Sequence, residues 1–62
     1  MGARIRQHRT GAGLTLERLG EMIRRDRRTI SLWEHGAAVP DLDDLTALAV
    51  ALDLHLWQLF VG

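Results

Sequence analysis

The fold of this chain is decided by the stretch Asp26-Arg27-Arg28-Thr29-Ile30-Ser31-Leu32-Trp33-Glu34-His35-Gly36. Asp26 is suited to cap the start of a helix, because its carboxylate accepts hydrogen bonds from backbone N–H groups that lack partners in the first turn. Gly36 is suited to end the helix, since glycine enters the left-handed conformation without a Cβ penalty. Ile30 and Trp33 lie three residues apart and therefore predict an apolar stripe along one helical face.

The opposite face of this predicted helix carries charge and hydrogen-bonding groups. Its residues are Arg27, Arg28, Ser31 and Leu32. Guanidinium groups, a hydroxyl and an exposed aliphatic side chain are able to meet base edges and phosphates. The stretch therefore predicts a DNA recognition helix, and contact with DNA is favoured over a face that is merely solvated. Trp33 is expected in the core and not in a base stack.

The composition predicts one small domain that folds without covalent staples. Its 62 residues include no cysteine, so neither a disulfide nor a thiolate zinc site is available. A chain of this length is expected to have a stability of about 3–9 kcal/mol. No apolar run approaches the roughly 18 residues of a membrane span, and the first residues do not form the apolar core of a signal peptide. A cytoplasmic, nucleoid-associated protein is expected, with no membrane partner.

The net charge of zero conceals a strong division along the chain. Residues 1–35 hold all eight arginines and four acidic residues, which gives a net charge of +4. Residues 36–62 hold four aspartates and no arginine or lysine, which gives −4. Such an asymmetry orients a domain toward DNA even where there is no net attraction.

The spacing of apolar residues predicts an all-α protein of five helices. They are expected over Ala3–Thr10, from Leu16 to about Arg24 with Thr15 as the cap, between Asp26 and Gly36, from about Pro40 to Leu52, and over Leu56–Phe60. The expected inner positions are Leu16, Leu19, Met22 and Ile23 in the second helix, and Leu42, Leu45, Leu48, Ala49 and Leu52 in the fourth.

Two further features of these helices have a structural interpretation. Gly20 lies inside the second helix, where glycine costs about 1 kcal/mol relative to alanine, and so predicts the close approach of another helix. Asp41, Asp43 and Asp44 crowd the first turn of the fourth helix, where the helix macrodipole favours negative charge. Helix capping therefore explains this acidic cluster better than a metal site does.

Four motifs follow one another in a recognisable order. They are Gly13-Leu14-Thr15-x-Glu17-x-Leu19-Gly20, then Thr29-Ile30-Ser31-x-Trp33-Glu34-x-Gly36, then Pro40-x-Leu42-x-x-Leu45-x-x-Leu48-Ala49-x-Ala51-Leu52, and finally Leu59-Phe60. From Ile5 to Phe60 the chain resembles the phage-repressor and Cro-type (Xre) helix-turn-helix family. The resemblance implies a lambda-repressor-like bundle of five helices. Residues 1–62 would form this single domain, with the helix-turn-helix at about residues 15–36.

The resemblance also implies roles for individual residues. It places the third helix in the major groove of double-stranded DNA, with Arg28 able to pair with a guanine and Leu32 able to contact a thymine methyl group. Arg9 and Glu34 match a pair that ties the first helix to the third. The residues expected to contact bases are Arg27, Arg28, Ser31 and Leu32, and those expected to contact phosphates are Thr15, Arg24, Arg25 and Thr29.

The chain departs from the family pattern at four places, one of which is His8, where a leucine is usual. The turn before the third helix commonly has a glycine and a small apolar residue, whereas this chain has Arg24 and Arg25. Arg24 must therefore adopt a positive φ at some cost, or the turn differs. Leu16 replaces a polar residue that braces a phosphate, and the loop after Gly36 has no basic residue. These two losses are expected to weaken DNA binding, with Arg24 and Arg25 compensating.

Nothing in the sequence indicates an enzyme, a metal site or a cofactor. His8, His35 and His55 do not share metal-ligand spacing. Ser31 and His35 are four residues apart, but they lack an orienting acid and an oxyanion hole. The favoured function is that of a transcriptional regulator, and a repressor in particular. The alternatives are a protein-interaction module and the targeting domain of a larger protein or antitoxin.

The C-terminal part has more apolar surface than a short last helix can bury. Val50, Leu56 and Trp57 are the residues concerned. Trp57 either folds over the small core or contributes to a two-fold homodimer interface, which would place two recognition helices about one DNA turn apart. A third possibility is that this surface docks on further domains. Val61 and Gly62 are expected to be a cut end or a free terminus.

Overall fold

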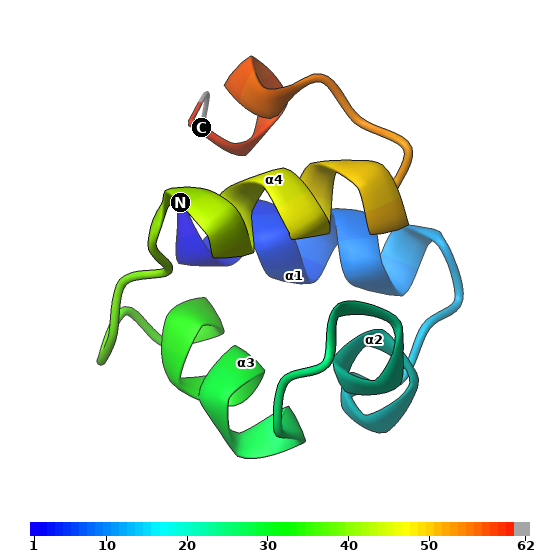
Figure 1. Ribbon diagram of the computed structural model, residues 1–62, viewed down its shortest axis with the longest axis vertical. Helices are drawn as coiled ribbons and strands as arrows, with labels where there is room; N and C mark the ends of the chain where they lie inside the picture. The colour runs from blue at the N-terminus through cyan, green and yellow to red at the C-terminus, as the bar shows by residue number, and fades with distance from the viewer. Residues whose placement is uncertain (61–62) are drawn as a thin grey trace.

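The computed structural model describes residues 1–60, which form four α-helices and one short 3₁₀ helix (Figure 1). The prediction for Val61 and Gly62 lies outside the described residues. The elements in chain order are α1 (Gly2–Gly11), α2 (Leu16–Ile23), α3 (Arg27–Glu34), α4 (Leu42–Ala51) and η1 (Leu56–Leu59). No strand occurs in residues 1–60, so the all-α prediction is confirmed.

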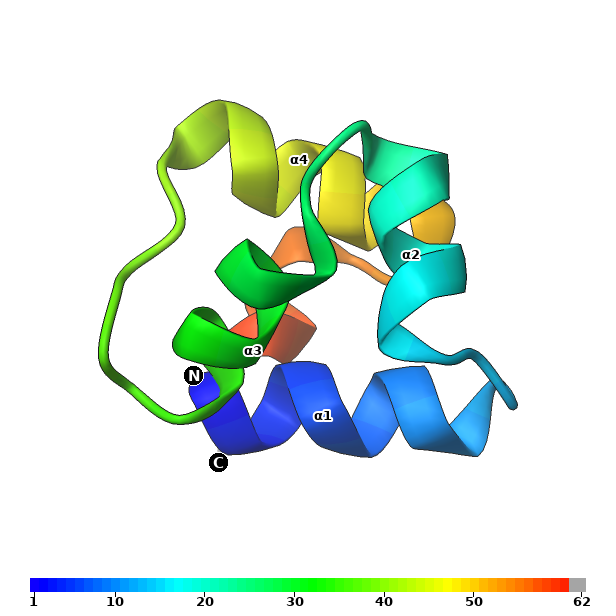
Figure 2. The ribbon, with the colours of Figure 1, turned by 90° about the horizontal axis from the view of Figure 1, so that it is seen from below.

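The helices enclose a single core. α1 and α4 lie on opposite sides of the molecule in Figure 2, with α2 and α3 joining them at the front. α3 packs on α1, α2 packs on α4, and η1 packs on both α1 and α4. The core takes at least one fully or almost fully buried side chain from each element: Ile5, Leu19, Ile30, Trp33, Leu45, Leu48 and Leu59.

Two positions that were expected in the core lie outside it. Leu42 is 68% exposed because it opens α4, one turn before the part of that helix that crosses the core. Met22 is also exposed, since Leu19 and Ile23, four residues apart, define the inner face of the short α2. The remaining stripe of α4 is buried as predicted.

The predicted caps of the central stretch are confirmed. The Asp26 carboxylate accepts a hydrogen bond from the backbone N–H of Arg28 at 3.0 Å. The Thr15 hydroxyl accepts one from the backbone N–H of Arg18 at 3.0 Å and so caps α2. Gly36 takes a left-handed φ of 74° just after α3. These local contacts fix where α2 and α3 start and where α3 stops.

The prediction of five α-helices is wrong at the last segment. Leu56–Leu59 is one turn of 3₁₀ helix, with hydrogen bonds of 3.0 Å from the Gln58 N–H to the His55 carbonyl and from the Phe60 N–H to the Trp57 carbonyl. Four residues are too few to establish a ladder of i→i−4 bonds, whereas a 3₁₀ turn is common in pieces of this length. Leu59 still reaches the core from this turn.

The turn between α2 and α3 combines a close approach with a left-handed residue. A Cβ at Gly20 would collide with the carbonyl oxygen of Arg25, so Gly20 does mark a close approach. Its nearest neighbour is the backbone of the turn, however, and not another helix. Arg24 has φ 59° and ψ 45°, so of the two alternatives, a positive φ at Arg24 or a different turn, the first is the one observed.

Replacing Arg24 with glycine is expected to stabilise the protein by about 0.5–1 kcal/mol. The left-handed conformation costs a residue with a Cβ roughly 1–2 kcal/mol, part of which is offset by the greater backbone entropy that glycine loses on folding. Urea denaturation of Arg24→Gly beside Arg24→Ala is the measurement. The alanine variant keeps the strain and removes the charge, so a glycine variant no more stable than alanine would contradict the prediction.

No helix within residues 1–60 is long and apolar enough to cross a membrane.

Candidate nucleic-acid interface

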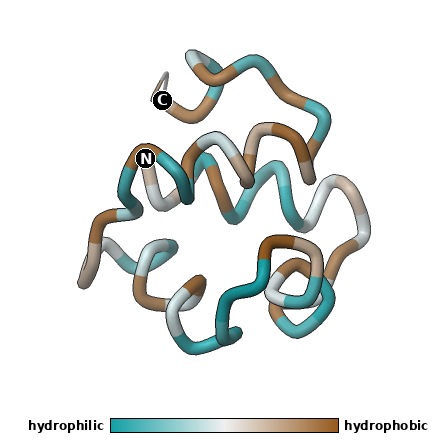
Figure 3. The backbone as a smooth tube through the Cα atoms, in the orientation of Figure 1, coloured by the Kyte–Doolittle hydropathy of each residue, from teal (hydrophilic) through white to brown (hydrophobic). Residues whose placement is uncertain are grey.

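α2 and α3 form a helix-turn-helix with a strongly polar edge. The hydrophilic run of residues 24–28 joins the two helices at the lower edge of Figure 3. α3 presents Ile30 and Trp33 to the core, which leaves its other face toward solvent. Apolar packing against the core therefore holds α3 in place, and its arginines lie on the opposite side, which faces solvent.

An open hollow of about 240 Å³ lies between α2 and α3 and is lined by Leu16, Arg27, Arg28 and Ser31. Three of the four residues predicted to contact bases are thus brought together. The fourth, Leu32, is 43% exposed and follows Arg28 by four residues, so both lie along one face of α3. Leu16 was not among the predicted site residues, although its unusual apolar character was a signal.

Glu17 introduces a carboxylate beside this hollow. One of its oxygens lies 3.4 Å from Nη1 of Arg27, and both side chains are mostly exposed. An ion pair with this exposure contributes little to stability. The ion pair does affect the position of a side chain, because it draws the Arg27 guanidinium toward the first turn of α2. Glu17 belonged to the motifs of the sequence, but nothing there indicated this partner.

Three of the four residues predicted to contact phosphates have side chains that are exposed or half-buried. Thr15 and Arg24 are exposed, and Thr29 is half-buried in the first turn of α3. The Thr15 oxygen accepts the capping hydrogen bond, and its O–H proton remains free to be donated. The helix start that Thr15 caps also presents backbone N–H groups, an arrangement suited to an anion.

The fourth, Arg25, has a partner within the protein. Its Nη2 and Nε lie 2.7 and 2.8 Å from Oδ1 of Asp44, and Asp41 is 4.0 Å away. Asp41 and Asp44 also form a reciprocal capping box at the start of α4, with hydrogen bonds of 2.8 and 3.2 Å. Arg25 therefore ties the turn before α3 to α4, and capping with this ion pair accounts for Asp41 and Asp44.

The pair implied for Arg9 and Glu34 is present behind the interface. Nε and Nη2 of Arg9 donate to the two Glu34 carboxylate oxygens at 2.7 and 3.1 Å, and Nη1 donates to the Leu14 carbonyl at 2.9 Å. The Glu34 side chain is 3% exposed and that of Arg9 is 12% exposed. The hydrogen bond with Glu34 raises the pKa of Arg9, although burial opposes this rise. The pair fixes the end of α3 to α1 and to the loop before α2.

The apolar surface expected near the C-terminus is also present. Val50 is 78% and Trp57 60% exposed, and Leu56 and Phe60 are exposed as well. The alternative in which Trp57 folds over the core is therefore wrong, because Leu59 closes that side instead.

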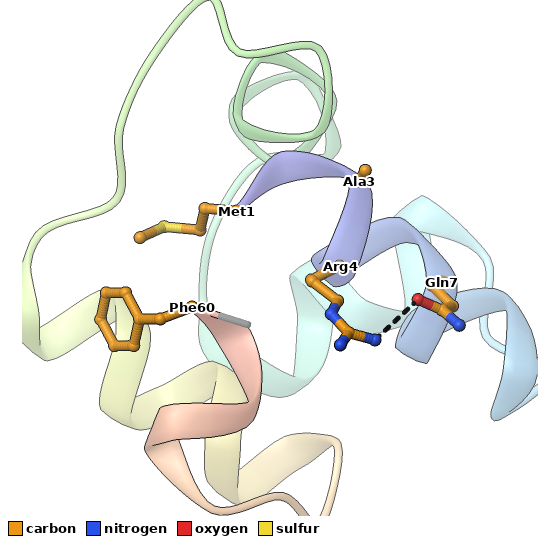
Figure 4. A pocket seen from close by; sticks show the side chains of 5 residues that line it. All are labelled: Met1, Ala3, Arg4, Gln7 and Phe60. Atoms are coloured by element: carbon orange, nitrogen blue, oxygen red, sulfur yellow. Dashed lines mark hydrogen bonds between the residues drawn. The ribbon is translucent and has the colours of Figure 1, made fainter. Parts of the chain in front are cut away.

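A larger hollow of about 460 Å³ lies beside this surface, between the start of α1 and the end of η1 (Figure 4). Met1 and Phe60 lie on one side of it, and the Arg4 guanidinium turns the other way to donate to Gln7 at 3.2 Å. None of the residues predicted to contact DNA lines this larger hollow.

Comparison with known proteins agrees with this arrangement. The model of a family described as "Helix-turn-helix domain" matches residues 1–56, which include all four α-helices. A similar relative is the "HTH-type transcriptional activator BcrR" of Enterococcus faecalis, which is 32% identical over 59 residues. The match covers 95% of this chain and 29% of that protein, so the chain spans less than a third of its relative's length. No solved structure matches the chain. The chain belongs to the helix-turn-helix domain family.

Proposed function

We propose that this chain is a sequence-specific DNA-binding domain of a transcriptional regulator and that α3 enters the major groove of double-stranded DNA. The observation that carries the proposal is the hollow between α2 and α3, where Arg27, Arg28 and Ser31 meet on the outer side of a helix anchored by Ile30 and Trp33. The major groove admits one α-helix, and arginine is the commonest reader of guanine there. The order of the sequence motifs supports the phage-repressor and Cro-type class within the family.

The proposed contacts divide into two sets. Arg27, Arg28, Ser31 and Leu32 contact bases. Thr15, Arg24, Thr29 and the first N–H groups of α2 contact phosphates, which fix the register of the protein on the duplex without reading sequence. Arg25 supports this second set indirectly, because its guanidinium is paired with Asp44 and positions the turn.

Binding is proposed to involve two copies of the chain. The exposed apolar residues Val50, Leu56 and Trp57 support a two-fold interface, to which the structure adds Phe60. A homodimer would present two copies of α3 to a roughly palindromic operator. This role is binding and not catalysis, and it places the protein with the nucleoid in the cytoplasm.

The direction of regulation depends on where the operator lies. A domain bound across a promoter excludes the transcription machinery, which is the repressor function that we favour. The relative from Enterococcus faecalis is named an activator. A similar domain therefore also occurs in a protein of the opposite effect, and DNA recognition itself is common to both.

The test is selection from random duplex DNA by the full chain at about 100 mM salt, where phosphate contacts still support binding. A two-fold-symmetric motif is expected, and its half-site spacing reports the dimer geometry. A single half-site would retain the DNA function and remove the dimer. The control is the double variant Arg27→Ala/Arg28→Ala, which is expected to enrich no motif.

The targeting domain of a larger protein or antitoxin stays an alternative, and so does a protein-interaction module. It would be favoured by one apolar patch that joined Leu16 and Leu32 beside α3. Leu16 instead shares its hollow with two arginines and Ser31. Absence of any retained DNA in the selection would nevertheless turn the assignment to this alternative.

A further inference from the structure

Leu16 is anchored on one side and accessible on the other. It is the first residue of α2, directly after the Thr15 cap, and its half-buried side chain packs against the edge of the core. It also lines the hollow in front of α3. An apolar side chain held in this way loses little conformational entropy on contact with a ligand, so it is well prepared to bind a small apolar group.

Arg28 is the arginine of that hollow that remains available to a ligand. Arg27 is drawn to Glu17 at 3.4 Å, whereas no carboxylate within residues 1–60 lies within 4 Å of the Arg28 guanidinium. Leu32 follows Arg28 along α3, and Leu16 lies across the hollow from it. The free guanidinium is thus bordered by aliphatic side chains.

This arrangement suits a particular pair of neighbouring bases. An arginine that pairs with O6 and N7 of guanine lies near the plane of that base, so its flat face covers the edge of the neighbouring base. If that neighbour is a pyrimidine on the 5′ side, the substituent on its C5 atom projects into the major groove beside the guanidinium. Leu16 lines the same hollow as Arg28, which makes it the apolar side chain available to such a methyl group.

We propose that Leu16 recognises the C5-methyl group of a pyrimidine on the 5′ side of the guanine that Arg28 contacts. The inference rests on the proposed function and adds the identity of a second base. The recognised chemistry is the methyl group, which both thymine and 5-methylcytosine carry and which uracil and cytosine lack. Leu16 thereby supplies a contact to a base at the position where the family pattern has a polar residue.

The experiment uses a duplex obtained by the selection described above. The guanine under Arg28 is the one whose preference disappears in selection with Arg28→Ala. In that duplex the thymine on its 5′ side is replaced by deoxyuridine, a change of one methyl group. Burial of one such group contributes about 0.8 kcal/mol, which corresponds to an affinity change of about fourfold. In a second comparison, cytosine and 5-methylcytosine occupy the same position. The affinities of these two duplexes are expected to differ by the same factor as those of the thymine and deoxyuridine duplexes.

The variants identify the residue that reads the methyl group. Leu16→Ala is expected to bind the thymine and deoxyuridine duplexes equally, while Leu16→Met, which keeps the apolar volume, preserves the difference. Leu32→Ala is the matched control, because it removes the contact of Leu32 with a different base and is expected to keep the same ratio at this one. Circular dichroism of each variant establishes that it is folded.

Three outcomes would overturn the inference. They are equal binding of the thymine and deoxyuridine duplexes by the unaltered protein, a ratio that is lost in Leu32→Ala but kept in Leu16→Ala, and a selected motif with a purine on the 5′ side of the guanine. Each of these occurs in a protein that still binds DNA. They are therefore distinguishable from failure of the proposed function, in which no duplex is selected at all.

Discussion

Replacement of Glu34 with alanine is expected to lower the free energy of unfolding by about 3–5 kcal/mol, because it leaves the buried charge of Arg9 without a partner. The Arg9 side chain is 12% exposed, and two of its three hydrogen bonds go to the Glu34 carboxylate. A chain of this length has only about 3–9 kcal/mol of stability in total. We therefore expect a large fraction of the Glu34→Ala protein to be unfolded at 25 °C.

Urea denaturation followed by circular dichroism measures this loss, and Glu21→Ala is the matched control. Glu21 pairs with Arg18 at 3.6 Å with both side chains mostly exposed, so its removal is expected to change stability by less than about 0.5 kcal/mol. The double variant Arg9→Met/Glu34→Leu removes both charges and is expected to recover much of the loss. A loss below about 1 kcal/mol in Glu34→Ala would show that the pair does not hold α3 in place.

Replacement of Arg28 with alanine is expected to weaken binding to the selected operator by about 1–3 kcal/mol, or roughly 5- to 150-fold. The guanidinium has no ionic partner within residues 1–60 and lines the hollow in front of α3, so the substitution removes a DNA contact and leaves the core unaltered. Preference is expected to relax at one base position only. Fluorescence anisotropy with the operator and its single-base variants measures both effects.

Arg28→Lys separates the two possible origins of such a loss. Lysine keeps the charge but cannot form the planar, bidentate contact that arginine makes with guanine. We expect this variant to retain the salt dependence of binding and to lose the base preference. A loss that is uniform across all sequences would make Arg28 a phosphate contact, and unchanged binding would contradict its place in the interface.

The parts of the fold that the sequence predicted well depend on contacts within one helical turn. The Asp26 and Thr15 caps and the left-handed Gly36 each involve residues at most three apart along the chain or a single backbone conformation. The positive φ of Arg24 was one of two alternatives that the resemblance left open, and it too concerns a single backbone conformation. The burial of Ile30 and Trp33 followed from helical periodicity once the ends of α3 were known.

The predictions that failed concern places where the extent of the core matters. Periodicity assigned Leu42 and Met22 to inner faces, but it gives no information on where along a helix the core ends. The last segment has an apolar pattern that fits an α-helix, and its shortness made it a 3₁₀ turn. For Trp57 the sequence left open whether it covers the core, which depends on whether Leu59 already fills that position.

The sequence by itself therefore determined the four α-helices, the Asp26 and Thr15 caps, the arginine-bearing face of α3 and the helix-turn-helix character of the domain, because these depend on residue types at fixed local spacing. Apart from the Arg9–Glu34 pair, which the resemblance implied, only the tertiary structure decided which side chains meet across helices. It paired Arg25 with Asp44, nineteen residues further along the chain, and placed Leu16 in the hollow beside Arg28. Such contacts depend on how the helices pack to bury their apolar faces. That packing involves all the helices together, so no single stretch of sequence specifies it.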